Sequence, residues 1–377
     1  MNHGKNPTVA VLGAGQMGIA IAATCLLRRF SVVLYDASLA VVKSASARAE
    51  TELKMQDESK VDDSLRLLEC TNDLRAVCSA AYVLESVTEK KRVKEKLYRQ
   101  VAPALKDDAL LMSNTSTISI AELTETLESE LIKRFCGFHF FHPVRLRSLV
   151  EIIRGKQTSE TTIQNAKSLA YALGKTPIIV NDGVGFLTNR LLNAYLTGAL
   201  QLLTKGGTIR QIDAAAERFG MATGPFRMMD EIGLDVTLHG GWALYKAFPD
   251  RVEPSPILLE LTRLGWLGRK TGLGFYCYES AAERLETSRL STTTSATMRD
   301  MPATDNVKLN AMIAERFANR KSVAPELLTE EKILARTVDE MFHEARRILD
   351  DGVTHSSQDI EFAAVLGLGF PQNRWKL

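Results

Sequence analysis

The chain has 377 residues, of which 45% are hydrophobic and 24% charged, a balance typical of globular proteins with two or three domains. Its formal net charge of +2 gives no reason to expect binding to nucleic acid or to a membrane surface. Five cysteines without a Cys-x-x-Cys pair indicate free thiols in a reducing, cytoplasmic compartment. No apolar run is long enough for a membrane span, and we predict no metal site.

Strand-like and helix-like segments alternate over residues 1–183, the first predicted domain. Charged stretches with helical periodicity, such as Glu89–Val101 and Thr161–Leu173, separate several short apolar runs. This alternation predicts an α/β fold with a parallel, doubly wound sheet of the Rossmann type. The predicted strands are Thr8–Leu12, Ser31–Tyr35, Tyr82–Val87, Ala109–Ser113, Phe135–Phe138, Leu149–Ile153 and Pro177–Val180.

After Asp182 the strand signal ends, and residues 184–279 are predicted as an all-α domain. Val184–Leu203 is apolar around most of its circumference and is predicted to be one long buried helix. Gly206-Gly207 and Gly224-Pro225 break the helices that follow. Residues 280–327 include a polar stretch without apolar periodicity and are predicted as a linker, and residues 328–377 are predicted as a second, shorter helical repeat.

Two parts of the chain resemble each other at a constant offset of 146 residues. One shared helix-turn-helix unit would explain this, and chance similarity between two amphipathic hairpins is the alternative. The second copy has Ala335 where the first has Asn189, so we expect it to be a packing unit and not a second active site. The matching pairs are Arg190 and Arg336, Ala199 and Ala345, Leu203 and Leu349, Gly206 and Gly352, Thr208 and Thr354, Asp213 and Asp359, and Pro225 and Pro371.

A glycine motif opens the first domain, between the first predicted strand and a helix. Gly13 allows a tight turn, Gly15 lets a pyrophosphate approach the backbone, and Gly18 lets the helix pack closely on the strand. Asp36 ends the second predicted strand, where a carboxylate binds ribose hydroxyls and repels a 2′-phosphate. The motif therefore predicts a dinucleotide site that prefers NAD to NADP. A glycine turn without nucleotide and a solvated Asp36 are the alternatives.

Four polar residues are candidates for the chemistry. Glu151 lies inside an apolar strand, where a carboxylate needs a partner, and His139 ends another strand. Paired with Glu151, the His139 imidazole would be held in place to accept a proton from an alcohol. Ser116 and Asn189 would hold the substrate oxygen. Taken singly, a histidine such as His139 is more often structural, Ser116 could be a helix N-cap, and Asn189 could be a solvent-facing helix residue.

At this point the sequence resembles the 3-hydroxyacyl-CoA dehydrogenase family over nearly its whole length. The resemblance rests on the glycine motif, Ser113-Asn-Thr-Ser116, His139-Phe-Phe-His-Pro143, Leu149-Val-Glu151 and Gly185-Phe-Leu-Thr-Asn189-Arg190, in this order. It implies NAD-dependent oxidation of (S)-3-hydroxyacyl-CoA in fatty-acid β-oxidation or 3-hydroxybutyryl-CoA metabolism. It also implies His139 as general base, Glu151 as its partner, and Ser116 and Asn189 near the substrate oxygen. The cofactor residues predicted for NAD are Gly13, Gly15, Gln16, Met17, Gly18, Asp36, Glu89, Lys94, Asn114 and Lys270.

Some features depart from the family pattern or leave alternatives open. His142 stands where the family usually has Asn, and Glu89, Lys94 and Lys270, taken as lone charges, would be solvent-exposed. The tail resembles the C-terminal domain of larger fatty-acid oxidation proteins, although no enoyl-CoA hydratase domain fits ahead of Thr8. The oligomeric state is left open between a homodimer and an intrachain pseudo-dimer, with thiolase as a candidate partner. The alternative functions are dehydrogenation of another hydroxy acid and a non-catalytic NAD-binding or scaffold subunit.

Overall fold

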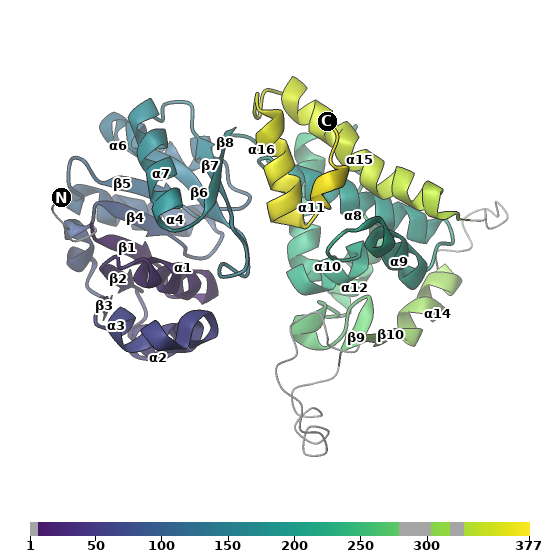
Figure 1. Cartoon of the computed structure of the whole chain (residues 1–377), viewed down its shortest axis with the longest axis horizontal. Helices are drawn as coiled ribbons and strands as arrows, with labels where there is room; N and C mark the ends of the chain where they lie inside the picture. The colour runs from purple at the N-terminus through teal and green to yellow at the C-terminus, as the bar shows by residue number, and fades with distance from the viewer. Residues whose placement is uncertain (1–6, 279–302, 317–327) are drawn as a thin grey trace, which may run out of the picture. The chain divides into compact units, whose positions relative to one another are not determined.

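The computed structural model describes residues 7–278, 303–316 and 328–377, and the chain folds into two compact units. The first unit contains the chain up to Leu187 together with Leu349–Gly367, and the second contains Thr188–Ile348 and Leu368–Leu377. The first unit is built on a sheet and the second is mainly helical (Figure 1). Residues 328–377, predicted as one repeat, are therefore divided between the two units.

An eight-stranded sheet forms the centre of the first unit, in the order β3-β2-β1-β4-β5-β6-β7-β8. The prediction of a wholly parallel sheet is wrong at one pair, because β7 is antiparallel to β6. Residues 141–148 connect these strands, and a parallel crossover needs about a dozen residues. The prediction also missed β3, an edge strand without an apolar run. The strands are β1 Val9–Leu12, β2 Val32–Tyr35, β3 Leu68–Thr71, β4 Tyr82–Glu85, β5 Leu110–Ser113, β6 Phe135–Phe140, β7 Leu149–Arg154 and β8 Thr176–Asn181.

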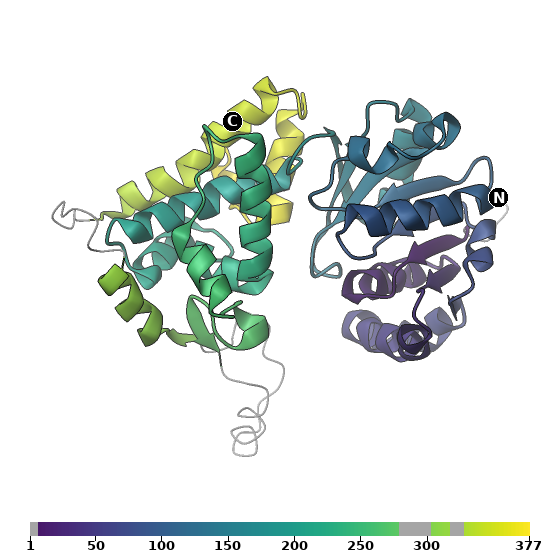
Figure 2. The same ribbon diagram turned by 180° about the vertical axis from the view of Figure 1, so that it is seen from behind.

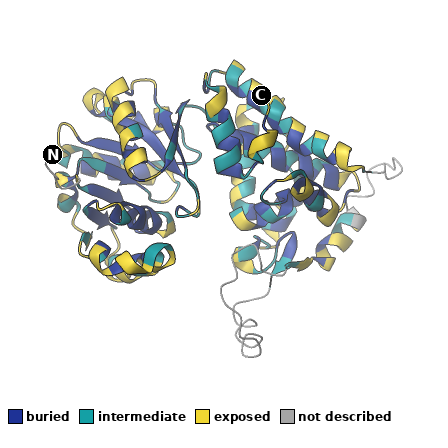
Figure 3. Cartoon of the chain, in the orientation of Figure 1, coloured by how far each residue is buried: buried dark blue, intermediate teal, exposed yellow. Residues whose placement is uncertain are grey.

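Helices cover both faces of this sheet. On one face, α1, α2 and α7 share a buried apolar cluster with the strands, to which Ile21, Leu53 and Ile163 belong (Figure 1). On the opposite face, seen in Figure 2, α4 buries Leu97 and Tyr98. Figure 3 shows α1 almost entirely buried, whereas α2 is exposed on its outer side. The helices are α1 Gln16–Leu27, α2 Leu39–Asp57, α3 Val61–Leu65, α4 Lys91–Val101, α5 Ile120–Thr124, α6 Ser129–Lys133 and α7 Glu160–Ala172.

The strand order reverses between β1 and β4. Chain connections lead from β1 to β2 and β3 on one side and from β4 to β5 and β6 on the other. Ligands of doubly wound sheets bind outside the carboxyl ends of the strands at such a reversal. The segments that follow β1, β4 and β5 carry most of the predicted site residues, and His139 lies near the carboxyl end of β6. The topology therefore places these residues along one edge of the sheet.

The second unit consists of helices and a two-stranded sheet. α8 begins at Thr188, later than predicted, because Gly185 (φ +75°) and Phe186 (φ +47°) cannot continue a right-handed helix. The antiparallel strands β9 Tyr276–Tyr278 and β10 Ala303–Asp305 and the helix α14 correct the all-α and linker predictions there. The rest of the predicted linker, 280–302 and 317–327, lies outside the described residues. The helices are α8 Thr188–Thr204, α9 Ile209–Phe219, α10 Pro225–Ile232, α11 Leu234–Ala247, α12 Pro256–Arg263, α14 Val307–Arg316 and α15 Glu330–Asp350.

Both copies of the predicted repeat have the same local structure, a long helix, a glycine turn and a second helix. α8 and α9 flank Gly206 (φ +96°), whereas α15 and α16 Ser357–Phe362 flank Gly352 (φ +69°). α8 packs directly on α15, since a Cβ on Gly198 would lie 1.7 Å from the carbonyl oxygen of Arg336. None of the described helices is long and apolar enough to cross a membrane.

The second copy of the repeat also covers the edge strand β8 of the sheet in the first unit. β8 is an edge strand, and its Asn181 N–H donates to the carbonyl of Val353 at 2.7 Å. The Asn181 amide donates to the carbonyl of Gly352 at 2.8 Å, and Ile179 N–H donates to Asp359 at 3.4 Å. The tail therefore covers backbone donors that an edge strand would otherwise expose.

Candidate active site

The glycine turn between β1 and α1 leaves no room for side chains at two of its positions. Gly13 has φ +104°, and a Cβ there would lie 2.6 Å from the carbonyl oxygen of Ser86, just after β4. A Cβ on Gly18 would lie 1.8 Å from the carbonyl oxygen of Gly13. A Cβ on Gly15 would meet nothing within 4 Å, so Gly15 borders open space. These are the turn, the close helix packing and the open approach that a dinucleotide turn requires.

Asp36 lies beside this turn, half-buried after β2. Its Oδ2 accepts the Ala14 N–H at 2.9 Å, and its Oδ1 accepts the Ser38 N–H at 2.9 Å. Arg48 of α2 donates to the carbonyl of Ala14 at 2.7 Å. The carboxylate is therefore fixed on the turn, which disfavours the alternative of a solvated strand-end acid.

His139 and Glu151 form a buried pair. The antiparallel register of β6 and β7 places them directly opposite each other, and His139 Nδ1 lies 2.8 Å from Glu151 Oε2. His139 is 6% exposed and Glu151 fully buried, and the other carboxylate oxygen accepts the Leu187 N–H at 3.3 Å. The ring of Phe141 lies 4.5 Å from the imidazole, centre to centre. The pair orients the ring and leaves Nε2 as the nitrogen that can exchange a proton with a ligand.

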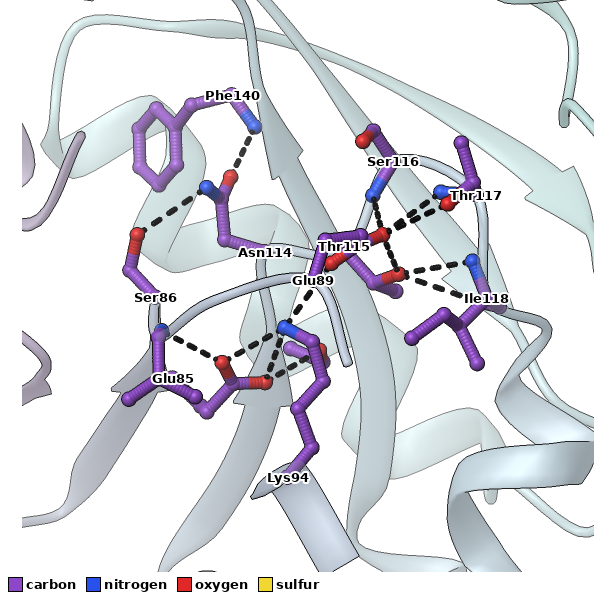
Figure 4. Close-up of polar contacts among 12 residues, drawn as sticks. Glu85, Ser86, Glu89, Lys94, Asn114, Thr115, Ser116, Thr117, Ile118 and Phe140 are labelled. Atoms are coloured by element: carbon purple, nitrogen blue, oxygen red, sulfur yellow. Dashed lines mark hydrogen bonds and ion pairs between the residues drawn. The ribbon is translucent and has the colours of Figure 1, made fainter. Parts of the chain in front are cut away.

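The turn that carries Ser116 is held by a single carboxylate oxygen (Figure 4). Glu89 Oε1 accepts the N–H groups of Ser116 at 2.9 Å and Thr117 at 3.0 Å, and also both threonine hydroxyls, Thr115 at 2.6 Å and Thr117 at 3.1 Å. Burial by itself raises the pKa of Glu89, but Lys94 and these hydrogen bonds outweigh it and lower the pKa to about 2. Ser116 is not a helix N-cap, because Ser119 caps α5.

Lys94 is 1% exposed, which excludes the solvated alternative for this residue. Its ammonium lies between two carboxylates, 2.8 Å from Glu85 Oε1 and 3.2 Å from Glu89 Oε2 (Figure 4). Glu89 itself is about three-tenths exposed and lies at the end of this buried ion pair. The two predicted cofactor residues are thus neighbours in one charge network.

Asn114 ties three strands of the site together. Its N–H donates to the carbonyl of Glu85 at 2.8 Å, and its side-chain amide donates to Ser86 Oγ at 3.3 Å. Its side-chain oxygen accepts the N–H of Phe140, the residue after His139, at 2.8 Å. Asn114 therefore connects the ends of β4, β5 and β6 (Figure 4).

Gln16 and His142 meet at the start of α1. The Gln16 amide nitrogen lies 3.0 Å from His142 Nε2. Partial burial, with Arg145 and Arg147 nearby, lowers the pKa of His142, so the ring is neutral at neutral pH. His142 thus places a polar, uncharged group beside the glycine turn, where the family usually has Asn.

Two predicted residues lie in the second unit. Asn189 is the second residue of α8 and is half-buried. Lys270 is exposed in the segment before β9 and pairs with Asp235 at 2.5 Å. Their roles toward substrate and cofactor stay predictions.

Sequence reasoning missed Glu85, the residue at the centre of the network around Lys94. It ends the apolar run Tyr82-Val-Leu-Glu85 and is completely buried. The available signal was the position itself, because an acid that ends a buried strand beside the strand-order reversal needs a buried partner. Ser113 and Tyr98 donate to Glu85, and they were missed as its partners because the burial of Glu85 was not considered.

Comparison with known proteins identifies the family of the chain. The family model described as 3-hydroxyacyl-CoA dehydrogenase, NAD binding domain, matches residues 8–183. The model described as 3-hydroxyacyl-CoA dehydrogenase, C-terminal domain, matches residues 185–278. The chain belongs to the 3-hydroxyacyl-CoA dehydrogenase family. The predicted family, the Rossmann-like sheet followed by helices, and the NAD-binding domain are thereby confirmed.

The relatives differ in how much of their length the chain matches. The chain is 32% identical to a fatty acid oxidation complex subunit alpha of Psychrobacter sp. strain PRwf-1, over 99% of this chain and 50% of the relative. It therefore spans about half the length of the curated relatives it matches. The structure of (S)-3-hydroxybutyryl-CoA dehydrogenase from Ralstonia eutropha is similar with 34% identity and a TM-score of 0.69, over 73% of this chain and 99% of that one. The structure of 3-hydroxybutyryl-CoA dehydrogenase from Escherichia coli K12 is similar with 25% identity and a TM-score of 0.80, over 97% of this chain and 90% of that one.

The residues of the glycine turn fit the NAD that the family's domain binds. Gly13 and Gly18 occupy positions that a Cβ would fill, and Gly15 is open. The N-cap of the twelve-residue helix α1 is Gly15, which has no side chain to accept the first N–H groups, and the first turn of the helix has no acid. Its N–H groups and partial positive charge are therefore available to a pyrophosphate, and Asp36 to a ribose.

Proposed function

We propose that this chain oxidises the 3-hydroxyl group of (S)-3-hydroxyacyl-CoA thioesters with NAD. The observation that carries the proposal is the buried contact of 2.8 Å between His139 Nδ1 and Glu151 Oε2 in the NAD-binding unit. Family membership supports the reaction class, and the carboxylate of Asp36 on the glycine turn supports NAD over NADP.

The mechanism assigns one proton transfer to the protein. With Nδ1 donating to Glu151, the lone pair of His139 Nε2 accepts the proton of the substrate hydroxyl. NAD, when bound, supplies the acceptor for the hydride from C3, so the substrate's O–H and C–H bonds are replaced by a C=O bond. Glu151 stabilises the imidazolium that results, and its burial keeps water from weakening that interaction.

The family resemblance supports two further roles, in which Ser116 and Asn189 are proposed to hold the substrate oxygen. The Ser116 backbone is held by Glu89, which keeps the hydroxyl-bearing residue in one place. A fixed hydroxyl donor near the substrate oxygen would stabilise the negative charge that develops on that oxygen as its proton leaves. Asn189 is proposed to add an amide donor from the first turn of α8, and Lys270 to contact the cofactor.

The test is oxidation of NADH with acetoacetyl-CoA, run beside NADPH and repeated with longer 3-oxoacyl-CoA substrates. We expect turnover with NADH, a clear preference over NADPH, and loss of turnover by about 10²–10⁴ in the His139→Ala variant with NADH binding retained. Unchanged turnover in His139→Ala would remove the base assignment. Turnover of free 3-oxo acids without activity on their CoA esters would instead favour a dehydrogenase of another hydroxy acid.

The physiological setting is a further part of the proposal. The matched relatives are named as fatty acid oxidation complex subunits, which supports an acyl-CoA substrate and a thiolase as the partner that consumes 3-oxoacyl-CoA. Cytoplasmic location and an intrachain pseudo-dimer of helical repeats are proposed with it, the latter supported by the close packing of Gly198 on Arg336. Mass measurement in solution, with and without a thiolase, tests both the oligomeric state and the partner.

A further inference from the structure

Glu85 is a fully buried carboxylate that the proposed reaction does not use. Its Oε1 accepts the Val87 N–H at 2.8 Å and Lys94 Nζ at 2.8 Å. Its Oε2 accepts Tyr98 Oη at 2.6 Å, Ser113 Oγ at 2.7 Å and Lys94 Nζ at 3.0 Å. Burial and the Glu85 carboxylate raise the pKa of Tyr98 well above its usual range, so the phenol keeps its proton and donates. A buried charge with this many partners is held in one position.

Lys94 transmits that position to a second carboxylate. Its ammonium has two contacts to Glu85 and one, at 3.2 Å, to Glu89 Oε2. Because the Lys94 ammonium has two contacts to the fully buried Glu85 and one to the half-buried Glu89, we infer that Glu85 fixes its position. The other oxygen of Glu89 accepts the Ser116 and Thr117 N–H groups. One continuous series of contacts therefore runs from Glu85 to the turn that carries Ser116 (Figure 4).

The same residue also fixes the neighbouring strand ends. The Glu85 carbonyl accepts the Asn114 N–H, and the Asn114 side chain holds Phe140 beside His139. The carbonyl of Ser86, the next residue in sequence, lies so close to Gly13 that a Cβ there would be 2.6 Å from its oxygen. Glu85 thus lies where the glycine turn, the Ser116 turn and the His139 strand are joined.

We propose that Glu85 is a positioning residue that acts through Lys94 and Glu89 to hold the Ser116 turn for hydride transfer from a hydroxyacyl substrate. The proposal rests on the proposed function, because Ser116 needs fixing only if it binds a reacting oxygen. A merely structural ion pair would stabilise the fold equally but would leave the turn and the turnover of folded protein unchanged.

The central experiment compares Glu85→Gln with the unaltered chain by two readouts. Glutamine keeps the shape but removes the charge, so among the described residues Lys94 keeps an ion pair with Glu89 alone. We expect kcat for folded protein to fall by about 10–100-fold, as for a displacement of about 1 Å in a site, with KM for acyl-CoA changed less than about threefold. Independently of activity and cofactor, we expect amide hydrogen exchange at Ser116 and Thr117 to quicken by about tenfold or more.

Two further variants separate positioning from stability. Tyr98→Phe removes one hydrogen bond to Glu85 but keeps the ring that packs edge-on against Phe135, so we expect a smaller change in the same direction. Ala166→Gly in α7, on the other face of the sheet, lowers stability by helix propensity and a lost methyl group. We expect Ala166→Gly to keep the unaltered kcat and the unaltered exchange at Ser116, and Tyr98→Phe also serves if Glu85→Gln does not fold.

The outcomes are distinct. Slower turnover with faster exchange confined to 115–117 supports the proposal. Unaltered kcat and exchange in Glu85→Gln, or faster exchange spread equally over α7, would overturn it and leave Glu85 a structural residue. If the unaltered chain shows no turnover with any 3-oxoacyl-CoA, the proposed function fails, while the exchange at Ser116 and Thr117 still reports whether Glu85 holds the turn.

Discussion

Replacing Glu151 by Gln tests the imidazole–carboxylate pair most directly. The change keeps the side chain's size but removes the charge that faces His139 Nδ1 at 2.8 Å. A hydrogen bond to a charged group contributes about 1.5–3 kcal/mol, which corresponds to a factor of about 10–150 in rate if it is realised only with imidazolium. The Gln amide can also donate to Nδ1, which places the ring proton on Nε2 and blocks it as a base.

Together these effects predict a fall in kcat of about 10²–10⁴ for Glu151→Gln. The assay is the loss of NADH absorbance with acetoacetyl-CoA, and NADH fluorescence measures cofactor binding separately. We expect NADH affinity to change little, since Glu151 faces His139 and Leu187 within the protein. The control is Glu69→Gln, the same substitution at an exposed residue of β3 in the same unit, which should retain full turnover. Turnover of Glu151→Gln within a factor of about three of the unaltered chain would refute the reasoning.

The remaining predictions concern the glycine turn, an acid and a helix contact. Gly15→Ala should keep the melting temperature, because a Cβ meets nothing within 4 Å, yet weaken NADH binding by about tenfold in a fluorescence titration; unchanged affinity would contradict an approach of the pyrophosphate at this point. Gly13→Ala should instead cost at least about 1–2 kcal/mol in denaturant unfolding, from φ +104° and the contact with Ser86 oxygen. The pKa of Glu89 is lowered from 4.5 to about 2, so its carboxylate contributes stability that is present above pH 4.5 and lost as the pH falls toward 2. The difference in unfolding free energy between the unaltered chain and Glu89→Gln should be on the order of 3 kcal/mol at pH 7 and should shrink over that pH range. A difference that stays constant in acid unfolding would disprove the assignment. Gly198→Val should force α8 away from α15, because a Cβ would lie 1.7 Å from the carbonyl oxygen of Arg336, and should lower the unfolding free energy by about 1–3 kcal/mol in denaturant unfolding; an unchanged unfolding free energy would contradict this close packing.

Local features of the sequence were sufficient for several parts of the site. Gly13, Gly15 and Gly18 could be assigned because their tasks are set by backbone sterics within one strand-turn-helix unit. Apolar runs located every strand of the large sheet except β3, whose half-exposed edge position removes the apolar signal. The need of Glu151 for a partner followed from a charge inside an apolar strand, and His139 was the partner that the structure shows.

Tertiary structure alone decided which distant groups meet. The antiparallel register of β6 and β7 brings His139 opposite Glu151, whereas the predicted parallel arrangement has no such pairing. The burial of Glu85 and Lys94 depends on neighbours from two strands and a helix, and the tail's contacts with Asn181 join residues far apart in sequence. Periodicity reports how one segment is buried, but a buried charge is stable only with partners that other segments supply, and chain topology determines which segments those are.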